Sequence, residues 1–230
     1  MFRYANHGRF ALSLLFALYL LDIGACAMCL WDFVRFEYQT LGLPQDRFGL
    51  SAEQRLRWAE ATEHYLQRGD NMVELGSLRF FDGTTAFSQR ERAHLWDTHR
   101  LLVRAHLIFY IGTALITLGG TLAAIKRARR LFWSVLKIGS CMACCIIAVL
   151  ALSLLLDFRI LFNAFHTLFF KSSSWIFYDT DTLLRLFPLR FWRDAFLCYF
   201  AIILAFGSAV SLVSRKLSGG THFENEASCK

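Results

Sequence analysis

The chain has 230 residues, of which 56% are hydrophobic and 16% aromatic, with two prolines and a net charge of +7. This composition excludes a disordered or collagen-like chain, because such chains are poor in aromatic residues or rich in proline. Seven cysteines in this length are too few for a disulfide-stapled miniature domain. With a mean hydropathy of +0.39, the chain is predicted to be an integral membrane protein.

Four segments of the sequence are long and apolar enough to cross a bilayer. Each holds about the 20 apolar residues that span a hydrocarbon core ~30 Å thick. The segments are residues 10–31, 105–125, 131–156 and 195–213. We therefore expect an all-α polytopic membrane protein that forms a single membrane domain over residues 1–230. Two longer segments, about 32–100 and 157–194, connect the first helix to the second and the third to the fourth.

Clusters of basic residues predict the orientation of these helices. Arg3 and Arg9 precede the first helix, residues 126–130 join the second to the third, and Arg215 and Lys216 follow the fourth. By the positive-inside rule these positions, and with them both chain termini, face the cytoplasm. Because the charge excess marks orientation, no nucleic-acid partner is expected. Any active site is predicted on the extracytoplasmic face, in the two longer segments.

The first apolar segment also imitates a signal peptide that is removed before a lipid-modified cysteine. The imitation rests on the residues Ile23 to Cys26, which follow an apolar run. However, Asp22 interrupts that run and the hydrophobic stretch continues to Trp31. We therefore expect an uncleaved first helix.

Two Cys-x-x-Cys pairs, Cys26 with Cys29 and Cys141 with Cys144, raise the alternative of a membrane thiol-disulfide oxidoreductase. Cysteine also serves as a small apolar residue in packed helices. The two pairs would lie at different depths, ~24 Å and ~15 Å along helices that rise from the same side at 1.5 Å per residue. Packing is the favoured interpretation, and redox chemistry stays an alternative.

Two capping-box patterns predict helix starts in the first long segment, at Ser51 and at Ser88. The first begins a short polar helix that ends near Leu66. The second is followed by no helix breaker up to Ile125, so one helix is expected to run from water into the second span. It carries Glu91, His94 and Asp97 at three-residue spacing on one side. Asp97 could orient His94 as a general base; the competing interpretation is an ordinary solvated helix face.

The second long segment is unusually aromatic, with 14 aromatic residues between positions 158 and 200. Such residues favour the headgroup level of a membrane. Apolar side chains from Phe158 to Phe169 have the helical period of an element lying along the surface. Opposite them, Arg159, Asn163 and His166 form a polar stripe, which places a histidine where ester bonds of lipids lie. The alternative is a membrane-anchoring helix with a polar edge.

Several motifs in these segments resemble one bacterial family, the lipoprotein intramolecular transacylases, which are four-helix integral membrane proteins. The motifs are the runs 87–97, 165–170, 174–177 and 181–188, and the pair Phe191-Trp192. The resemblance implies an acyltransferase that acts on a diacylglyceryl-modified bacterial lipoprotein in the cytoplasmic (inner) membrane. It would move the sn-2 acyl chain to the α-amine of the same cysteine, which gives an N-acyl, S-monoacylglyceryl lipoprotein. By motif match, His94 and His166 correspond to the family's two essential histidines.

This chemistry needs a base for the amine, an acid for the leaving alkoxide and donors for an oxyanion. We assign the base to His94, oriented by Asp97, and the acid to His166, although the two could be reversed. The residues expected to support them or bind substrate are Asp97, Asn163, Ser174, Trp175, Asp181 and Arg185. Arg185, Asn163 and Ser174 are the candidate oxyanion donors, with Asp181 expected to pair with Arg185.

No cofactor and no metal are expected, because the histidines lack metal-ligand spacing. A Gly-x-Ser-x-Gly nucleophile motif is also missing from the sequence. Besides the substrate lipoprotein, membrane lipid is the one partner expected. A thiol-disulfide oxidoreductase and a non-catalytic membrane scaffold remain as alternatives.

Overall fold

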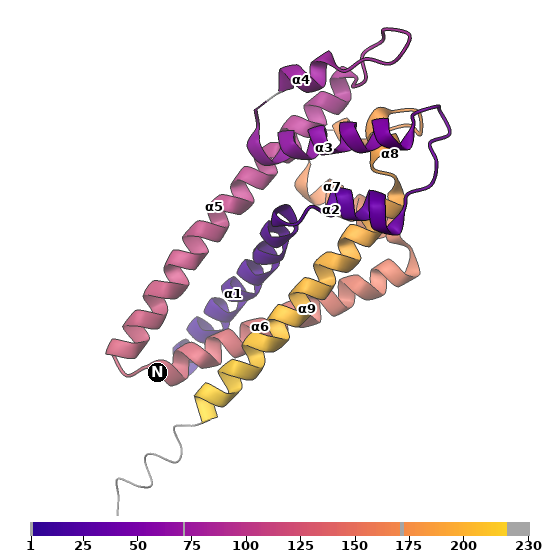
Figure 1. Ribbon diagram of the computed structural model, residues 1–230. Helices are drawn as coiled ribbons and strands as arrows, with labels where there is room; N and C mark the ends of the chain where they lie inside the picture. Colours follow the sequence, from indigo (N-terminus) through magenta and orange to yellow (C-terminus); the bar gives the residue numbers. More distant parts are fainter. Residues whose placement is uncertain (1, 71, 171–172, 220–230) are drawn as a thin grey trace, which may run out of the picture. The chain divides into compact units, whose positions relative to one another are not determined.

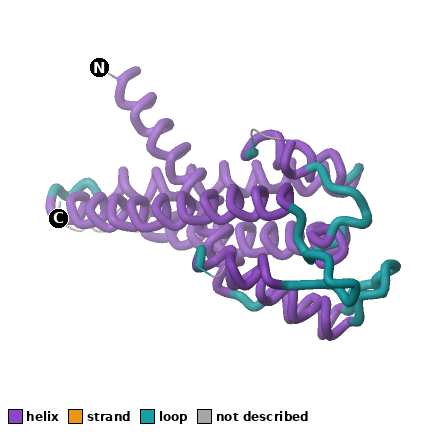
Figure 2. The backbone as a smooth tube through the Cα atoms, turned by 90° about the horizontal axis from the view of Figure 1, so that it is seen from above, coloured by secondary structure: helices purple, strands orange, loops and turns teal. Residues whose placement is uncertain are grey.

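The computed structural model describes residues 2–70, 72–170 and 173–219, and nearly all of their regular structure is helical (Figure 2). Within those ranges, strand-like pairing is limited to one isolated bridge between Arg79 and Thr85. Four helices are long and apolar enough to cross a membrane, and Figure 1 labels them α1, α5, α6 and α9. The expected all-α fold with four apolar helices is confirmed.

The four long helices cover the predicted spans, except that α1 ends at Leu30, one residue before the predicted end at Trp31, and each helix begins before the span predicted in it. They are α1 (Phe2–Leu30), α5 (Gln89–Ile125), α6 (Arg129–Leu156) and α9 (Leu189–Gly219). The 37 residues of α5 correspond to ~55 Å of helix, longer than the ~30 Å hydrocarbon core. The sequence predicted this extension from the capping box at Ser88. We expect this extension to place the residues near the start of α5 outside the apolar layer of the membrane.

By their contacts, the described residues divide into two compact units, and the expectation of one membrane domain stays a prediction. The first unit comprises residues 2–26, 106–152 and 198–219. In it α1 contacts α5 through the hydroxyls of Tyr19 and Thr113, 2.6 Å apart. The same helix α1 contacts α9, where the Tyr199 hydroxyl donates to the Leu21 carbonyl oxygen, 3.0 Å away.

Small residues allow α1 and α6 to approach closely within the first unit. A Cβ atom added at Gly139 would lie 2.5 Å from the backbone oxygen of Ser13. Ala143, one turn later on α6, is fully buried. Small residues at helix contacts are typical of membrane proteins, where van der Waals packing replaces the hydrophobic driving force.

The second unit comprises residues 27–105 and 153–197, apart from the three undescribed positions. Besides the adjoining ends of the long helices, its elements are short. They are α2 (Phe33–Phe36), the π-helix η1 (Glu37–Leu41), α3 (Ala52–Arg68), α4 (Met72–Ser77), α7 (Phe158–Phe169), the 3-10 helix η2 (Ser173–Trp175) and α8 (Thr182–Leu186).

Local capping sets where α3 begins and ends. The Ser51 hydroxyl oxygen accepts from the Gln54 N–H at 3.1 Å, as the sequence predicted. Gly69 ends the helix in the left-handed region, with φ +73°, and donates to Tyr65. After it, residues 72–77 form the short helix α4 around Gly76, which the sequence analysis did not predict. One glycine in six residues does not prevent a short helix.

The start of α5 is joined to α8 through a buried carboxylate. Glu91 is 2% exposed, and its Oε2 accepts from the Ser88 N–H at 2.7 Å, which completes the predicted capping box. Its Oε1 accepts from the Leu183 N–H at 2.8 Å. The Thr182 hydroxyl adds a contact by donating to the Ala86 carbonyl oxygen. Glu91, grouped with His94 and Asp97 by spacing, thus has a structural role.

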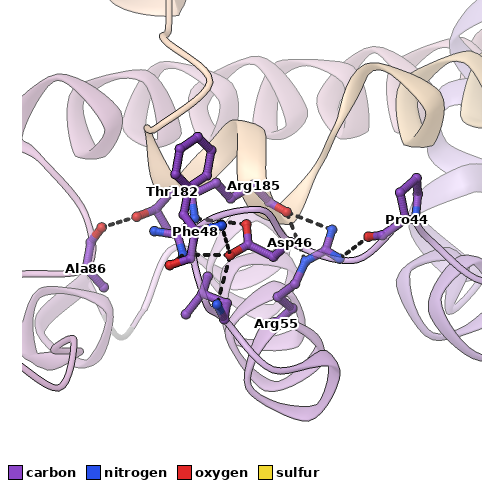
Figure 3. A network of polar contacts seen from close by, with 8 residues as sticks. Pro44, Asp46, Phe48, Arg55, Ala86, Thr182 and Arg185 are labelled. Atoms are coloured by element: carbon purple, nitrogen blue, oxygen red, sulfur yellow. Dashed lines mark hydrogen bonds and ion pairs between the residues drawn. The ribbon is translucent and has the colours of Figure 1, made fainter.

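A buried ion pair joins α8 to the loop before α3 (Figure 3). Arg185 donates from Nε and Nη2 to the two carboxylate oxygens of Asp46, at 3.0 and 2.9 Å. The side chains are only 7% and 3% exposed. Arg55 completes the network by donating to the Arg185 and Pro44 carbonyl oxygens. Burial opposes ionisation of Asp46, but hydrogen bonds from Arg185 and Leu50 outweigh it and lower the pKa of that carboxyl.

We expect Asp46→Asn to destabilise the protein by ~3–5 kcal/mol, because removing one partner leaves the other charge buried and unpaired. The measurement is thermal unfolding of the purified protein in detergent. The control is Arg159→Gln, which breaks the solvent-exposed ion pair with Asp157 and is expected to leave the Tm unchanged. Equal Tm values for Asp46→Asn and the wild type would contradict a stabilising role of the network.

Candidate functional site

The structure brings His94 and His166 together within the second unit, from helices that are far apart in the sequence. His94 lies in the second turn of α5, and His166 lies near the end of α7. Their ring centroids are 5.8 Å apart and the ring planes are inclined by 27°, a stacked arrangement. His166 is 8% exposed and His94 is half-buried. The two histidines that the motifs indicated therefore form one pair.

Aromatic rings surround the histidine pair. Phe162 and Trp175 lie 4.1 and 5.0 Å from the His166 ring, centroid to centroid. Phe170 contacts both histidines, at 4.8 Å from His94 and 5.5 Å from His166. Phe177 meets the His94 ring edge-on at 5.4 Å. These contacts exclude water from much of the two imidazoles and give them an apolar surrounding.

A backbone hydrogen bond fixes the tautomer of neutral His166. Its Nδ1 lies 2.8 Å from the carbonyl oxygen of Phe162, one turn earlier on α7. A carbonyl oxygen only accepts, so Nδ1 carries the proton. The lone pair of the neutral ring is then on Nε2, which makes Nε2 the atom that can take up a proton.

Burial lowers the pKa of His166, because an apolar surrounding disfavours the charged imidazolium. The hydrogen bond to Phe162 acts in the opposite direction but is the smaller effect. Two stacked imidazoles also cannot both be charged without repulsion. The pair is therefore suited to hold one proton at most near neutral pH.

Asp97 does not orient His94. Nδ1 of His94 is buried and has no hydrogen-bond partner within the described part of the chain. The predicted orientation of His94 by the Asp97 carboxylate, which would accept a hydrogen bond from the ring, is therefore wrong. Residues three apart on a helix lie on a common side, but side-chain direction decides whether they touch. Glu91, the acidic residue in the first turn of the same face, accepts hydrogen bonds from the backbone N–H groups of Ser88 and Leu183 instead.

The predicted pairing of Asp181 with Arg185 is also wrong. Asp181 Oδ2 accepts from Arg90 Nη2 at 2.6 Å and from the Tyr178 N–H at 2.7 Å. Arg185 is instead bound by Asp46, and its guanidinium lies over the rings of Phe48 and Phe80. Nε and Nη2 of Arg185 are thus engaged with the loop before α3. Its predicted use as an oxyanion donor finds no support in this geometry.

The other predicted supporting residues are placed differently from one another. Trp175 contacts the His166 ring directly. Asn163 lies on the exposed side of α7, one turn before Thr167, whose hydroxyl donates to the Asn163 carbonyl oxygen. Ser174 is half-buried beside Trp175 in η2. Of these residues, Trp175 has a ring contact with the histidine pair.

Arg90 is the site residue that sequence reasoning missed. It pairs with Asp181 and lies over the rings of Phe177 and Tyr178, next to His94. Arg90 lies four residues before His94 on the same face of α5, and this spacing could have identified it from the sequence. The spacing argument looked instead for acidic partners at three residues.

The cysteines lie mostly in the helices of the first unit. None of the cysteines that the structure describes, among them Cys26, Cys141 and Cys144, forms a disulfide. Cys141 contacts the Ser211 hydroxyl across α6 and α9, with Sγ and Oγ 3.5 Å apart. A Cβ atom at Gly207 would lie 2.8 Å from Cys144 Sγ, so that thiol fills a close helix contact. These contacts fit the packing interpretation.

Comparison with known proteins gives one family. A family model described as "Lipoprotein intramolecular transacylase Lit" matches residues 9–192. An uncharacterized protein of Aquifex aeolicus (strain VF5) is 29% identical over 174 residues, which are 76% of each chain.

Solved structures show the same fold. The membrane-integral lipoprotein intramolecular transacylase Lit of Bacillus cereus matches with a TM-score of 0.73 and 19% identity, over 95% of this chain and 99% of that one. A variant of the Bacillus cereus protein with one histidine replaced by alanine matches with a TM-score of 0.68 and 19% identity, over 96% of this chain and 99% of that one.

We expect the His166 imidazole to take up its proton below the ordinary histidine pKa of ~6.5, because burial disfavours the charged form. The measurement is NMR titration of isotope-labelled histidines in micelles, with His166→Asn to assign the signal. The stability that neutral burial contributes is present above pH ~6.5 and is lost as the pH falls through the lowered pKa. A titration midpoint at or above that of a histidine-containing peptide would contradict this prediction.

Proposed function

Since the chain belongs to the lipoprotein intramolecular transacylase family and is therefore a membrane acyltransferase, we propose that it moves the sn-2 acyl chain of a diacylglyceryl-modified lipoprotein cysteine. The acceptor is the α-amine of the same cysteine, and the product is an N-acyl, S-monoacylglyceryl lipoprotein. The observation that carries this proposal is the stacked pair of His94 and His166 inside an aromatic enclosure.

The reaction requires two proton transfers, and a pair of histidines can carry out both. An α-amino group with a pKa of ~7.7–8.0 is mostly protonated near neutral pH, and the protonated amine has no lone pair for attack. A base must therefore take a proton from nitrogen. When the ester bond breaks, the departing glyceryl oxygen needs a proton in return.

The geometry favours His166 as the base and His94 as the acid, the reverse of the assignment made from spacing. The hydrogen bond from His166 Nδ1 to the Phe162 carbonyl oxygen leaves the Nε2 lone pair free for the amine proton. The lowered pKa of His166 keeps this lone pair available near neutral pH. Burial and the neighbouring His166 lower the pKa of His94 to about 4, so a proton on His94 is readily given up. His94, stacked on His166, is therefore the neighbouring group that can return a proton to the alkoxide.

Donor and acceptor belong to the same substrate molecule, so the enzyme mainly has to fold that molecule into attack geometry. Well-oriented intramolecular reactions can gain up to ~7–11 kcal/mol in this way. An acyl-enzyme intermediate is then unnecessary, and the sequence has no nucleophile elbow that would support one.

The apolar surroundings of the pair suit an acylated substrate. The Phe162, Phe170 and Trp175 rings border the histidines. On the outside of α7, Ile160 and Leu168 are 64% and 76% exposed. In a membrane such side chains are covered by lipid tails, so α7 would lie at the level of the ester bonds. We place the site on the extracytoplasmic face of a bacterial inner membrane, with both termini inside, on the distribution of Lys and Arg.

We expect His94→Ala and His166→Ala each to lower transacylation by ~10²- to 10⁴-fold, the usual contribution of a positioned acid or base. The chain is expressed in bacterial cells whose lipoproteins lack N-acylation. Mass spectrometry of a lipoprotein's N-terminal peptide then detects the N-acyl, S-monoacylglyceryl form.

The matched control is His64→Ala, which changes an exposed histidine of α3 that has no contact with the pair. It is expected to retain full activity. Unchanged N-termini in cells that express the wild-type chain would contradict the proposed reaction. Transfer from a phospholipid would instead leave both acyl chains on the glyceryl group.

We expect combined replacement of five cysteines by alanine to leave the acylated product in place, because Cys141 and Cys144 lie at contacts between helices of the first unit, away from the histidine pair. The five are Cys26, Cys29, Cys141, Cys144 and Cys145. The same mass spectrometry measures the outcome, normalised to the amount of folded protein. Loss of activity here, together with full activity of the histidine variants, would favour a thiol oxidoreductase. If neither set of substitutions had an effect, a non-catalytic scaffold would be the better account.

A further inference from the structure

Arg90 lies one helical turn before His94 on α5 and borders the same aromatic ring. Its guanidinium carbon is 5.6 Å from the centre of the Phe177 ring and 5.3 Å from that of Tyr178. Phe177 in turn meets the His94 ring edge-on at 5.4 Å. A guanidinium and an imidazole of the histidine pair therefore contact the same phenyl ring.

The guanidinium of Arg90 is only partly used by the protein. Nη2 donates to Asp181 Oδ2 at 2.6 Å. Nε, by contrast, is buried and has no hydrogen-bond partner among the residues that the structure describes. Buried donors are nearly always paired in folded proteins. Neighbouring groups cover Nε itself, but the side chain as a whole is 38% exposed, so a bound substrate that displaces these groups can reach Nε.

Arg185 provides the contrast. It has two hydrogen bonds to Asp46 and one to the Phe48 carbonyl oxygen, and its side chain is 7% exposed. The positive charge of Arg185 is paired with Asp46 and holds the loop before α3 in place. Of these two arginines, Arg90 is the one that combines a neighbouring histidine of the pair with an unpaired buried N–H.

We infer that Arg90 is a catalytic residue that donates to the oxyanion of the transferred acyl group, an inference that rests on the proposed function. The amine nitrogen forms a bond to the sn-2 carbonyl carbon and gives its proton to a histidine, while the carbonyl oxygen becomes negatively charged. The carbon-oxygen bond to glycerol then breaks. The glyceryl oxygen takes up a proton and becomes a hydroxyl, and the carbonyl of the new amide reforms.

A fixed cation beside the developing oxyanion stabilises the transition state more than the ground state, because the ester oxygen is neutral before attack. Asp181 is the positioning residue in this arrangement. Its carboxylate holds Nη2, and the rings of Phe177 and Tyr178 support the guanidinium plane. Nε is left to face the reacting carbonyl.

The test measures kcat and KM of purified protein in detergent with a synthetic diacylglyceryl lipopeptide. We expect Arg90→Gln to lower kcat by ~10²- to 10³-fold, as loss of one oxyanion donor does in other acyl-transfer enzymes. Arg90→Lys keeps the charge but loses the fork of donors, so at least a tenfold loss is expected. The pH at which activity falls should not move, because the histidines set it.

Three controls separate this role from a structural one. Arg100→Gln changes an exposed arginine of the same helix and should leave kcat unchanged. Asp181→Asn breaks the ion pair but keeps the guanidinium, so its loss should be much smaller than that of Arg90→Gln. An sn-2 ether analogue, which cannot react, should bind Arg90→Gln within ~3-fold of the wild-type Kd, because it develops no oxyanion.

Equal losses for Asp181→Asn and Arg90→Gln would overturn the inference, since the ion pair alone would then explain both. So would a loss confined to the Kd of the ether analogue, or full kcat in Arg90→Lys and Arg90→Gln. In each of these outcomes the wild-type enzyme still forms the N-acyl product. Failure of the proposed function is distinct, because the wild type would then form none.

Discussion

The arrangement of the second unit depends on the buried carboxylate of Glu91. One oxygen accepts from the Ser88 N–H and sets the start of α5, and the other accepts from the Leu183 N–H and holds α8. Hydrogen bonds to a charged acceptor are about twice as strong as neutral ones, and a buried carboxylate without them is costly. Because Glu91 lies three residues before His94, this contact fixes the turn of α5 that leads into His94.

The charged residues around α8 divide into a structural and a reactive group. On one side, Arg185 and Asp46 form a buried ion pair that closes the loop before α3. On the other, Asp181 holds Arg90 beside Phe177 and His94. The five residues of α8 thus position a supporting network at one end and the candidate site at the other. Loss of the Arg185–Asp46 ion pair would be expected to displace the candidate site, since both lie along the same short helix.

Local signals allowed most of the helices to be predicted. The capping boxes at Ser51 and Ser88 predicted where α3 and α5 begin, because each cap involves residues three positions apart. The period of apolar residues likewise predicted α7. The short helix α4 was missed, since six residues with an internal glycine give no periodic pattern.

The sequence by itself determined the four apolar helices and marked His94 and His166, because hydropathy, caps and motif residues are properties of short segments. Only the tertiary structure decided which charges meet. Asp181 lies four residues from Arg185, yet it pairs with Arg90, 91 residues away, while Arg185 pairs with Asp46 at a separation of 139. The physical reason is that ion pairing follows side-chain direction and burial, and both are set by packing between distant segments.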